Sequence, residues 1–176
     1  VSVALSAERD PNKLLSLIVN TAMDLTDSDG GTLYLIDDKV LRFMVMVTRS
    51  KGVELGGNGE IIDLPPVPLD DSHICAHAAK TGHTFNIEDV YDSNDFDFSG
   101  PKHYDELNNY RTKSMVVIPL TENDGHVIGV LQLINAQNNG IVRAYTAEEE
   151  FIIQALGSEA AIALSTMNYM RELNAQ

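Results

Sequence analysis

The chain has 176 residues, of which 44% are apolar and 22% charged, the size and composition of one globular domain. Its 12 Lys and Arg against 26 Asp and Glu give a formal net charge of −14, which disfavours nucleic acid and anionic membrane surfaces as partners. A single cysteine excludes a disulfide framework. No apolar run reaches the length of a membrane span, so we expect a cytoplasmic domain over residues 1–176 without membrane insertion.

The first half of the chain predicts a helix followed by an antiparallel hairpin. Apolar residues recur at helical spacing over 10–27, and Asp10 followed by Pro11 is typical of a helix start. Residues 32–36 and 40–48 then have strand composition and are separated by a short turn.

The next segment alternates between irregular chain and short elements. Residues 52–59 are too glycine-rich for order of their own, 61–64 predict a short strand, and 65–68 predict an extended linker. A second helix begins near 70–72, where Asp or Ser can cap it, and ends at Gly82.

Residues 83–110, hereafter the lid segment, mix acidic with aromatic side chains and predict a folded lid over a pocket. Residues 114–120 and 127–134 predict two apolar strands at the centre of the sheet. A long helix follows over 146–174, with acidic residues in its first turn. This element order indicates an α+β fold with helices packed on an antiparallel sheet.

Sequence motifs for common enzyme chemistry are missing: there is no glycine-rich phosphate loop, no His-Glu-x-x-His and no Gly-x-Ser-x-Gly. His73 and His77 have the spacing of a metal pair, but no adjacent acidic motif completes a site, so we favour a capping or surface role. Cys75 has no resolving cysteine, and we interpret it as an unreactive thiol in a pocket wall. We therefore predict no catalytic residue, no metal site and no cofactor.

Five segments that together span most of the chain resemble a GAF domain. They are GTLYLID (31–37), DSHICAHAAKTGHTFNIEDVY (71–91), NNYRTKSMVVIPL (108–120), GHVIGVLQLIN (125–135) and YTAEEEFIIQALGSEAAIAL (145–164). The Tyr-Arg-Thr-Lys-Ser run before the central strand is similar to the F-R-T-R-N segment of the cyclic-nucleotide-binding GAF domains of phosphodiesterases and adenylyl cyclases. The resemblance implies a central antiparallel sheet of about six strands, with terminal helices on one face and a ligand lid on the other.

Those domains also carry an N-K…F-x-x-x-D-E signature. Asn135 stands for the Asn, Tyr145 for the Phe and Glu149-Glu150 for the acidic pair, but Ala136 replaces the Lys. The lysine-to-acid bridge that the family uses as a scaffold is therefore missing at this position.

The resemblance also implies a set of ligand-binding residues, namely Thr32, Thr48, Arg49, His73, Ile74, Cys75, Asp105, Asn108, Thr112 and Gln132. The Ile74 and Cys75 amides at a helix amino end can cradle a phosphate in an acidic protein. Asp105 can accept from the exocyclic amine of adenine while Thr112 donates beside it, which favours cAMP over cGMP as the ligand. Taken singly, the residues at 32, 48, 49 and 132 also fit ordinary strand and surface roles.

The resemblance thus predicts a regulatory domain excised from a larger signalling protein, and not an enzyme in itself. A cyclic nucleotide would close the lid and change the pose of the last helix, which would pass the signal to an output domain such as a nucleotide cyclase, phosphodiesterase or kinase. The alternative is a ligand-free GAF dimerisation module.

In either case residues 151–173 carry more apolar surface than one sheet face needs, which predicts a parallel homodimer through the terminal helices. A GAF-type methionine sulfoxide reductase and a bilin photoreceptor are disfavoured, because the first depends on several cysteines and the second on a Cys-His pair after the lid.

Overall fold

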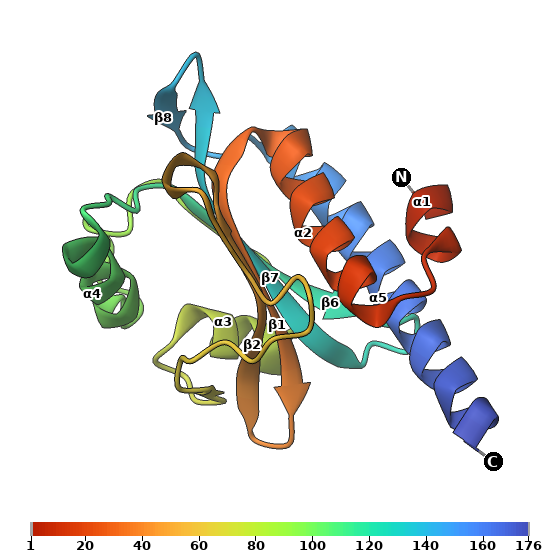
Figure 1. Ribbon diagram of the computed structural model, residues 1–176. Helices are drawn as coiled ribbons and strands as arrows, with labels where there is room; N and C mark the ends of the chain where they lie inside the picture. Colours follow the sequence, from red (N-terminus) through yellow and green to blue (C-terminus); the bar gives the residue numbers. More distant parts are fainter. Residues whose placement is uncertain (1, 176) are drawn as a thin grey trace.

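The computed structural model describes residues 2–175, with side chains described at 4–168 and at 173. Within these residues an eight-stranded antiparallel sheet runs in the order β3-β2-β1-β7-β6-β5, with β4 added to β2 and β8 added to β7 (Figure 1). The strands are β1 (Ser28–Asp37), β2 (Val40–Thr48), β3 (Val53–Leu55), β4 (Val67–Pro68), β5 (Phe85–Ile87), β6 (Met115–Thr121), β7 (Val127–Asn138) and β8 (Ile141–Arg143). The helices are α1 (Ser2–Ala7), α2 (Pro11–Thr26), α3 (Ile74–Thr81), α4 (Ser99–Asn108) and α5 (Ala147–Ala175), with a 3₁₀ turn at Arg49–Lys51.

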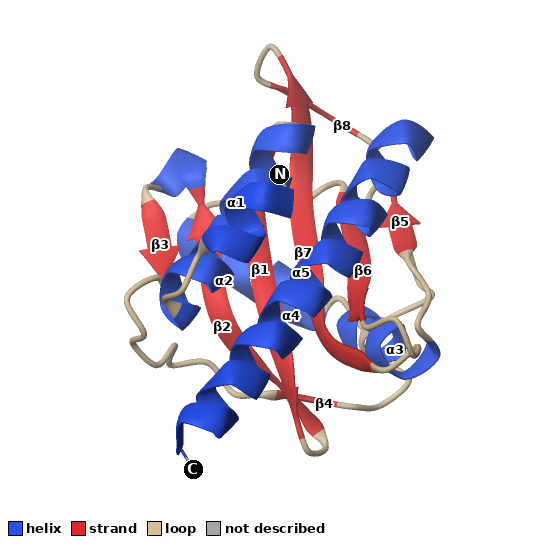
Figure 2. Cartoon of the chain, turned by 90° about the vertical axis from the view of Figure 1, so that its right-hand side faces the viewer, coloured by secondary structure: helices blue, strands red, loops and turns tan. Residues whose placement is uncertain are grey.

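One face of the sheet, hereafter the helix-side face, is covered by α1, α2 and α5 (Figures 1 and 2). Its core includes Leu14 and Ile18 of α2, Leu33 of β1, Leu131 of β7 and Ile153 of α5, all fully buried. This alternation of strand residues toward the helices is what a half-covered antiparallel sheet requires.

The other face, hereafter the lid-side face, carries α3 packed on β6 and β7, and α4 farther out. Its smaller core includes Tyr34, Cys75, Phe98, Val117 and Val130. The expected arrangement, with terminal helices on one face and a lid on the other, is therefore confirmed.

The two long helices begin as their sequences predict. Asp10 accepts a hydrogen bond from the Asn12 amide and Pro11 is the first residue of α2. At α5 the Glu149 amide donates to the Thr146 hydroxyl at 3.1 Å, while the Thr146 amide donates to a Glu149 carboxylate oxygen at 3.0 Å, which forms a reciprocal capping box.

Several strand predictions were wrong. Residues 61–64 form no strand, and Ile61 is 96% exposed, because β2 is already paired with β3 and β4 on its outer side. The glycine-rich 52–59 segment contains β3, and the expected linker contains β4. The central path of the sheet has six strands, as expected, and β4 and β8 are added to β2 and β7.

Two helices were not foreseen. The sequence over 99–108 is mostly polar, so α4 lacks the run of apolar residues by which the other helices were recognised. The short α1 precedes the predicted first helix and buries Leu5 against α5. None of the helices over 2–175 combines the length and hydropathy needed to cross a bilayer.

Candidate functional site

A row of side chains crosses the lid-side face at the centre of the sheet. Thr32 of β1 pairs with Met46 of β2 on one side and with Gln132 of β7 on the other, and Gln132 pairs in turn with Val117 of β6. Directly opposed residues on adjacent strands have Cβ atoms about 4.5–5.5 Å apart, so the Thr32 and Gln132 side chains are immediate neighbours. We call Thr32, Gln132 and the residues that touch them the lid-side site.

The polar groups of this row are not all paired within the protein. Thr32 is 4% exposed, and its hydroxyl makes no hydrogen bond to any residue among 2–175. The Gln132 amide oxygen accepts from the Cys75 thiol at 3.2 Å, whereas no described residue accepts from its amide NH₂ group. Gln132 is half-buried, and neither its amide nitrogen nor the Thr32 oxygen is among the described side-chain atoms that are both fully buried and unpaired, so both groups are accessible to a ligand or water.

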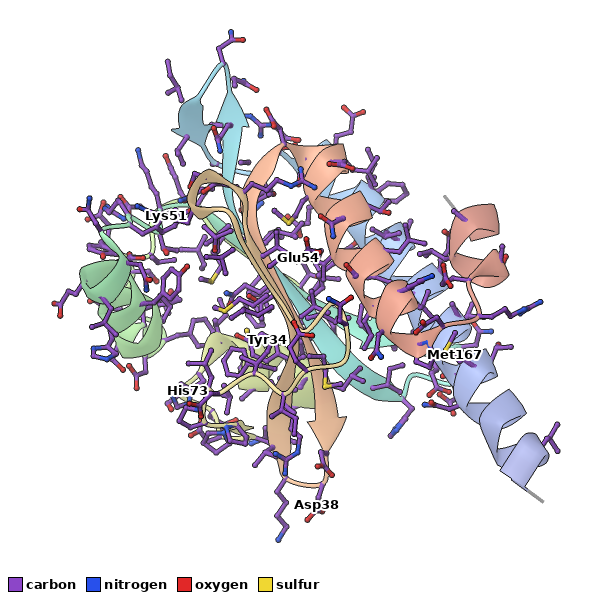
Figure 3. The ribbon with its side chains drawn as sticks, in the orientation of Figure 1. Tyr34, Asp38, Lys51, Glu54, His73 and Met167 are labelled. Atoms are coloured by element: carbon purple, nitrogen blue, oxygen red, sulfur yellow. The ribbon has the colours of Figure 1, made fainter. Side chains whose placement is uncertain are left out.

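Cys75 lies in the first turn of α3, and its side chain contacts Gln132 on the lid-side face. Burial raises the pKa of its thiol to about 12, so it stays protonated, in agreement with the expected unreactive thiol. Its sulfur also interacts with the hydroxyl of Tyr34, whose pKa is raised by burial and by this neighbour. Figure 3 shows Tyr34 and His73 on the lid side of the sheet, opposite Met167 of α5.

The amino end of α3 offers amides, but carboxylates flank it. His73 is the N-cap and makes no side-chain cap bond, and the amides of Ile74 and Cys75 have no acceptor among residues 2–175. The His73 ring lies 2.9 Å from an oxygen of Asp70 and 3.7 Å from one of Asp97. A phosphate at these amides would approach both acids, with His73 between them.

Hydrogen bonds to the Asp105 carboxylate, hereafter the latch, join α4 to the chain before β6. Among the residues of α4 Asp105 is buried, and this carboxylate accepts from the Thr112 amide at 2.8 Å, the Thr112 hydroxyl at 2.8 Å and the Tyr91 hydroxyl at 2.7 Å. Tyr104 of α4 shares a 3.1 Å hydrogen bond with Thr48 at the end of β2. These contacts hold a helix whose apolar packing is sparse.

A second polar network lies beneath the latch. Asp29 accepts from the Ser50 amide and hydroxyl and from the Tyr110 hydroxyl at 2.7 Å. Asn135 donates to the Tyr110 hydroxyl and to the Arg111 carbonyl, and accepts from the Lys113 amide. The network fixes the chain between α4 and β6.

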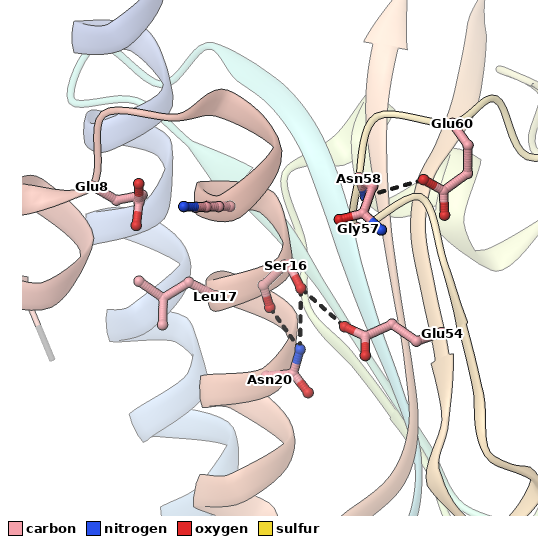
Figure 4. A pocket seen from close by; sticks show the side chains of 9 residues that line it. Glu8, Ser16, Leu17, Asn20, Glu54, Gly57, Asn58 and Glu60 are labelled. Atoms are coloured by element: carbon pink, nitrogen blue, oxygen red, sulfur yellow. Dashed lines mark hydrogen bonds between the residues drawn. The ribbon is translucent and has the colours of Figure 1, made fainter.

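Two further hollows lie away from the lid-side site. One, of about 500 Å³, is bounded by the turn between α1 and α2, by α2 and β3, and by the loop after β3. Its Ser16 and Glu54 side chains bond to each other, and Glu60 accepts from the Asn58 amide (Figure 4). Glu60 also accepts from the Gly56 amide. The other, of about 730 Å³, lies beside β5, and its lining includes Glu88, Asp89, Asp92 and Asp95. No metal-binding group of side chains occurs within residues 2–175.

Comparison with known proteins identifies the family. A family model described as the GAF domain matches residues 10–164. The chain belongs to the GAF domain family.

Relatives and solved structures agree with that assignment. The chain is 34% identical over 92 residues to the dual 3′,5′-cyclic-AMP and -GMP phosphodiesterase 11A of Takifugu rubripes, a match covering 52% of this chain and 10% of that protein. It is 27% identical over 153 residues to the probable 3′,5′-cyclic phosphodiesterase pde-5 of Caenorhabditis elegans, covering 84% of this chain and 19% of that one. The GAF domain of a phosphoenolpyruvate-protein phosphotransferase from Coxiella burnetii superimposes with a TM-score of 0.74 at 15% identity, over 99% of this chain and 92% of that one. The chain thus spans a tenth to a fifth of the two curated relatives.

The GAF fold brings some predicted ligand residues together and separates others. Thr32, Cys75 and Gln132 meet at the lid-side site, with Ile74 beside them on α3. Arg49 turns toward α2, where it forms a 2.8 Å salt bridge with Asp24, so the structure does not bring it to the site. Asn108 is exposed and donates to the Tyr104 carbonyl of its own helix.

Asp105 and Thr112 do lie together, as predicted, but they bond to each other. Both donors of Thr112, the amide and the hydroxyl, point to the Asp105 carboxylate. A purine edge could use this pair only after the latch opens.

The partners that sequence reasoning missed are tyrosines and Asn135. Tyr91, Tyr104 and Tyr110 supply the hydroxyls that bond Asp105, Thr48 and Asp29. The mixture of aromatic and acidic residues in the lid segment indicated that these side chains are packed, but it did not show which tyrosine bonds to which partner.

The missing lysine at Ala136 is compensated from the neighbouring strand. Ala136 pairs in register with Arg143 of β8, and Arg143 donates to both oxygens of Glu149, at 2.6 and 3.0 Å. Burial acts to raise the pKa of Glu149, but hydrogen bonds from Arg143 and Thr146 outweigh it, and the net pKa lies below its usual value. A basic-to-acidic bridge to the start of α5 is therefore present, with the cation displaced to β8.

Proposed function

We propose that this GAF domain is a regulatory module that binds a cyclic purine nucleotide at the lid-side site. The observation that carries the proposal is the neighbouring pair of Thr32 and Gln132 at the centre of the lid-side face, whose hydroxyl and amide NH₂ lack partners among residues 2–175. A ligand with complementary polar atoms can bond to these two groups without breaking a hydrogen bond within the protein. The names of the related phosphodiesterases supply the ligand class.

The relay of binding would run through α5 to an output domain of a larger protein. The helix packs on β6 next to the site strands, and its first turn is anchored to β8 by Arg143 and Glu149. A shift of β6 or β7 on binding would therefore displace the start of α5, a 29-residue helix that extends beyond the sheet (Figure 2). The domain itself performs no catalysis in this proposal.

The preference for cAMP over cGMP stays a prediction. It depends on Asp105 and Thr112 facing the base, and their mutual hydrogen bonds occupy them while the latch is closed. Competition between cAMP and cGMP for the domain tests which base is preferred, and this result does not depend on which residues form the site.

Titration calorimetry of the purified domain with cAMP, cGMP and 5′-AMP tests the proposal. We expect one cyclic nucleotide to bind per domain, 5′-AMP to bind more weakly, and Thr32→Val to reduce the affinity. Saturation at 100 times Kd should also stabilise the fold by about 2.7 kcal/mol in thermal unfolding. The absence of heat and of any thermal shift with both cyclic nucleotides at millimolar concentration would contradict it.

The ligand-free dimerisation module remains the second candidate, because α5 presents an apolar stripe to solvent. Phe151 is 71% exposed, Ile162 45% and Leu173 46%, while the side chains at 169–172 lie outside the described residues. Exposed apolar residues repeated along a helix favour a partner helix. Light scattering of wild type and Phe151→Glu tests this: a dimer lost in the variant supports the interface, and a monomeric wild type at high micromolar concentration contradicts it.

A further inference from the structure

The Gln132 amide is bonded on its oxygen side, and that bond comes from a residue with no other evident role. Cys75 is buried, protonated and unsuited to reaction, yet its sulfur lies 3.2 Å from the Gln132 amide oxygen. A thiol has one hydrogen to donate and a weak acceptor sulfur. Its orientation therefore influences which end of the amide faces Thr32.

The geometry at the sulfur gives the direction of the thiol hydrogen. Cys75 donates it to the Gln132 amide oxygen at 3.2 Å, and the sulfur also interacts with the Tyr34 hydroxyl in the lid-side core. Residues from β1, α3 and β7 thus meet at the Cys75 sulfur.

The free end of the amide has a second polar neighbour. Thr32 lies directly opposite Gln132, is 4% exposed, and its hydroxyl has no partner among residues 2–175. With the amide oxygen held by Cys75, the amide NH₂ and the Thr32 hydroxyl are the polar groups that the centre of the row can offer to a ligand.

We propose that Cys75 is a positioning residue that fixes Gln132 with its NH₂ group away from α3, so that the floor of the site presents a hydrogen-bond donor. The inference rests on the proposed function for its ligand: a cyclic purine nucleotide would place an acceptor atom, a ring nitrogen or a carbonyl oxygen, against Gln132. Glutamate at this position would present an acceptor and reject the same atom.

Affinity measurements with cAMP and cGMP test the consequence for binding. Cys75→Ala removes the donor and frees the amide to turn, so we expect the better-bound nucleotide to weaken by about 2- to 12-fold, the range of one neutral hydrogen bond. Cys75→Ser keeps a donor and should stay within about twofold of wild type. Gln132→Glu should weaken binding by more than Cys75→Ala does.

A matched control separates positioning from packing. Val90 is fully buried in the same lid-side core and forms no part of the contacts of Tyr34 and Gln132 with the Cys75 sulfur. Val90→Ala should lower the unfolding temperature without changing the affinity. Equal loss of affinity in Val90→Ala and Cys75→Ala, or no loss in Cys75→Ala, would overturn the role of the thiol.

Nuclear Overhauser contacts of the Gln132 side-chain NH₂ protons test the orientation without any ligand. We expect contacts to Thr32 and not to the Cys75 β-protons in wild type and Cys75→Ser, and contacts to both sides in Cys75→Ala. NH₂ contacts to Cys75 in wild type would overturn the inference even if nucleotides bind. If neither nucleotide binds but the contacts are as expected, the proposed function fails while the positioning role stands.

Discussion

The two faces of the central strands differ in what their side chains do. Leu33 and Leu131 oppose each other across β1 and β7 and are fully buried against α2 and α5. One residue along the same strands, Thr32 and Gln132 oppose each other on the lid-side face and keep polar groups unpaired. The same two strands therefore contribute apolar side chains to the core on one face and polar side chains that a ligand can bind on the other.

The helices over the two faces differ in the same way. On the helix-side face, α5 buries Ile153, Leu156 and Leu164. On the lid side, α4 buries the single carboxylate of Asp105 and is held by tyrosine and threonine hydroxyls. Elements with few buried apolar contacts open at low free energy, so α4 should open well before the core unfolds.

Truncation on the helix-side face should have the largest effect on stability. Leu131→Ala removes a fully buried side chain and leaves a cavity, which we expect to lower the free energy of unfolding by about 2–5 kcal/mol in urea denaturation. A loss below about 1 kcal/mol would remove the contrast between the faces.

Breaking the latch should loosen α4 and leave the core intact. Asp105→Ala removes hydrogen bonds to a carboxylate, which we expect to lower the opening free energy of α4 by about 1.5–3 kcal/mol in hydrogen exchange, while Thr112→Ala costs about 0.5–1.5 kcal/mol. Both variants should also bind nucleotide more weakly. Glu106→Ala, an exposed change on the same helix, serves as the control. Unchanged exchange at 99–108 in Asp105→Ala would show that the latch does not hold the helix.

The bridge between β8 and α5 should make stability depend on pH. Because the folded-state pKa of Glu149 is lowered, its contribution is present above the unfolded pKa and is lost as pH falls through the folded pKa. Glu149→Gln should therefore cost about 1 kcal/mol at pH 7 and progressively less below pH of about 4. A constant difference between the two proteins from pH 7 to pH 3 would contradict this assignment.

The smallest effect on stability is expected at the lid-side row itself. Thr32→Val replaces an unpaired buried hydroxyl by a methyl group, so the free energy of unfolding should change by less than about 0.5 kcal/mol or rise slightly. The same variant should still lose nucleotide affinity. A clear loss of stability would mean that the hydroxyl has a structural partner.

The strongly periodic elements of the fold were predictable, and the weakly patterned ones were not. The helix over 10–27 and the strand at 114–120 have strong apolar patterns, and both are found. By contrast, β4 is held by pairing with β2 and α4 by side-chain hydrogen bonds, and neither leaves an apolar pattern in the sequence.

The candidate site shows the same limit. Thr32, Cys75 and Gln132 could be selected by resemblance. Three other features depend on the tertiary structure: the Asp105–Thr112 bond, the direction of Arg49 toward α2, and the replacement of a lysine at 136 by Arg143. Pairs between residues distant in the chain cannot be read from one sequence unless both members belong to a known motif.

Hydrogen exchange of the domain with and without cAMP, repeated with cGMP, tests the central claim most directly. If the lid-side face is the ligand site, saturating nucleotide should slow exchange in α4 (99–108), at the start of α3 and in the central part of β7, by more than in α2 (11–26). Equal slowing in α2 and α4, or no slowing in α4 with either nucleotide, would contradict the assignment of the two faces.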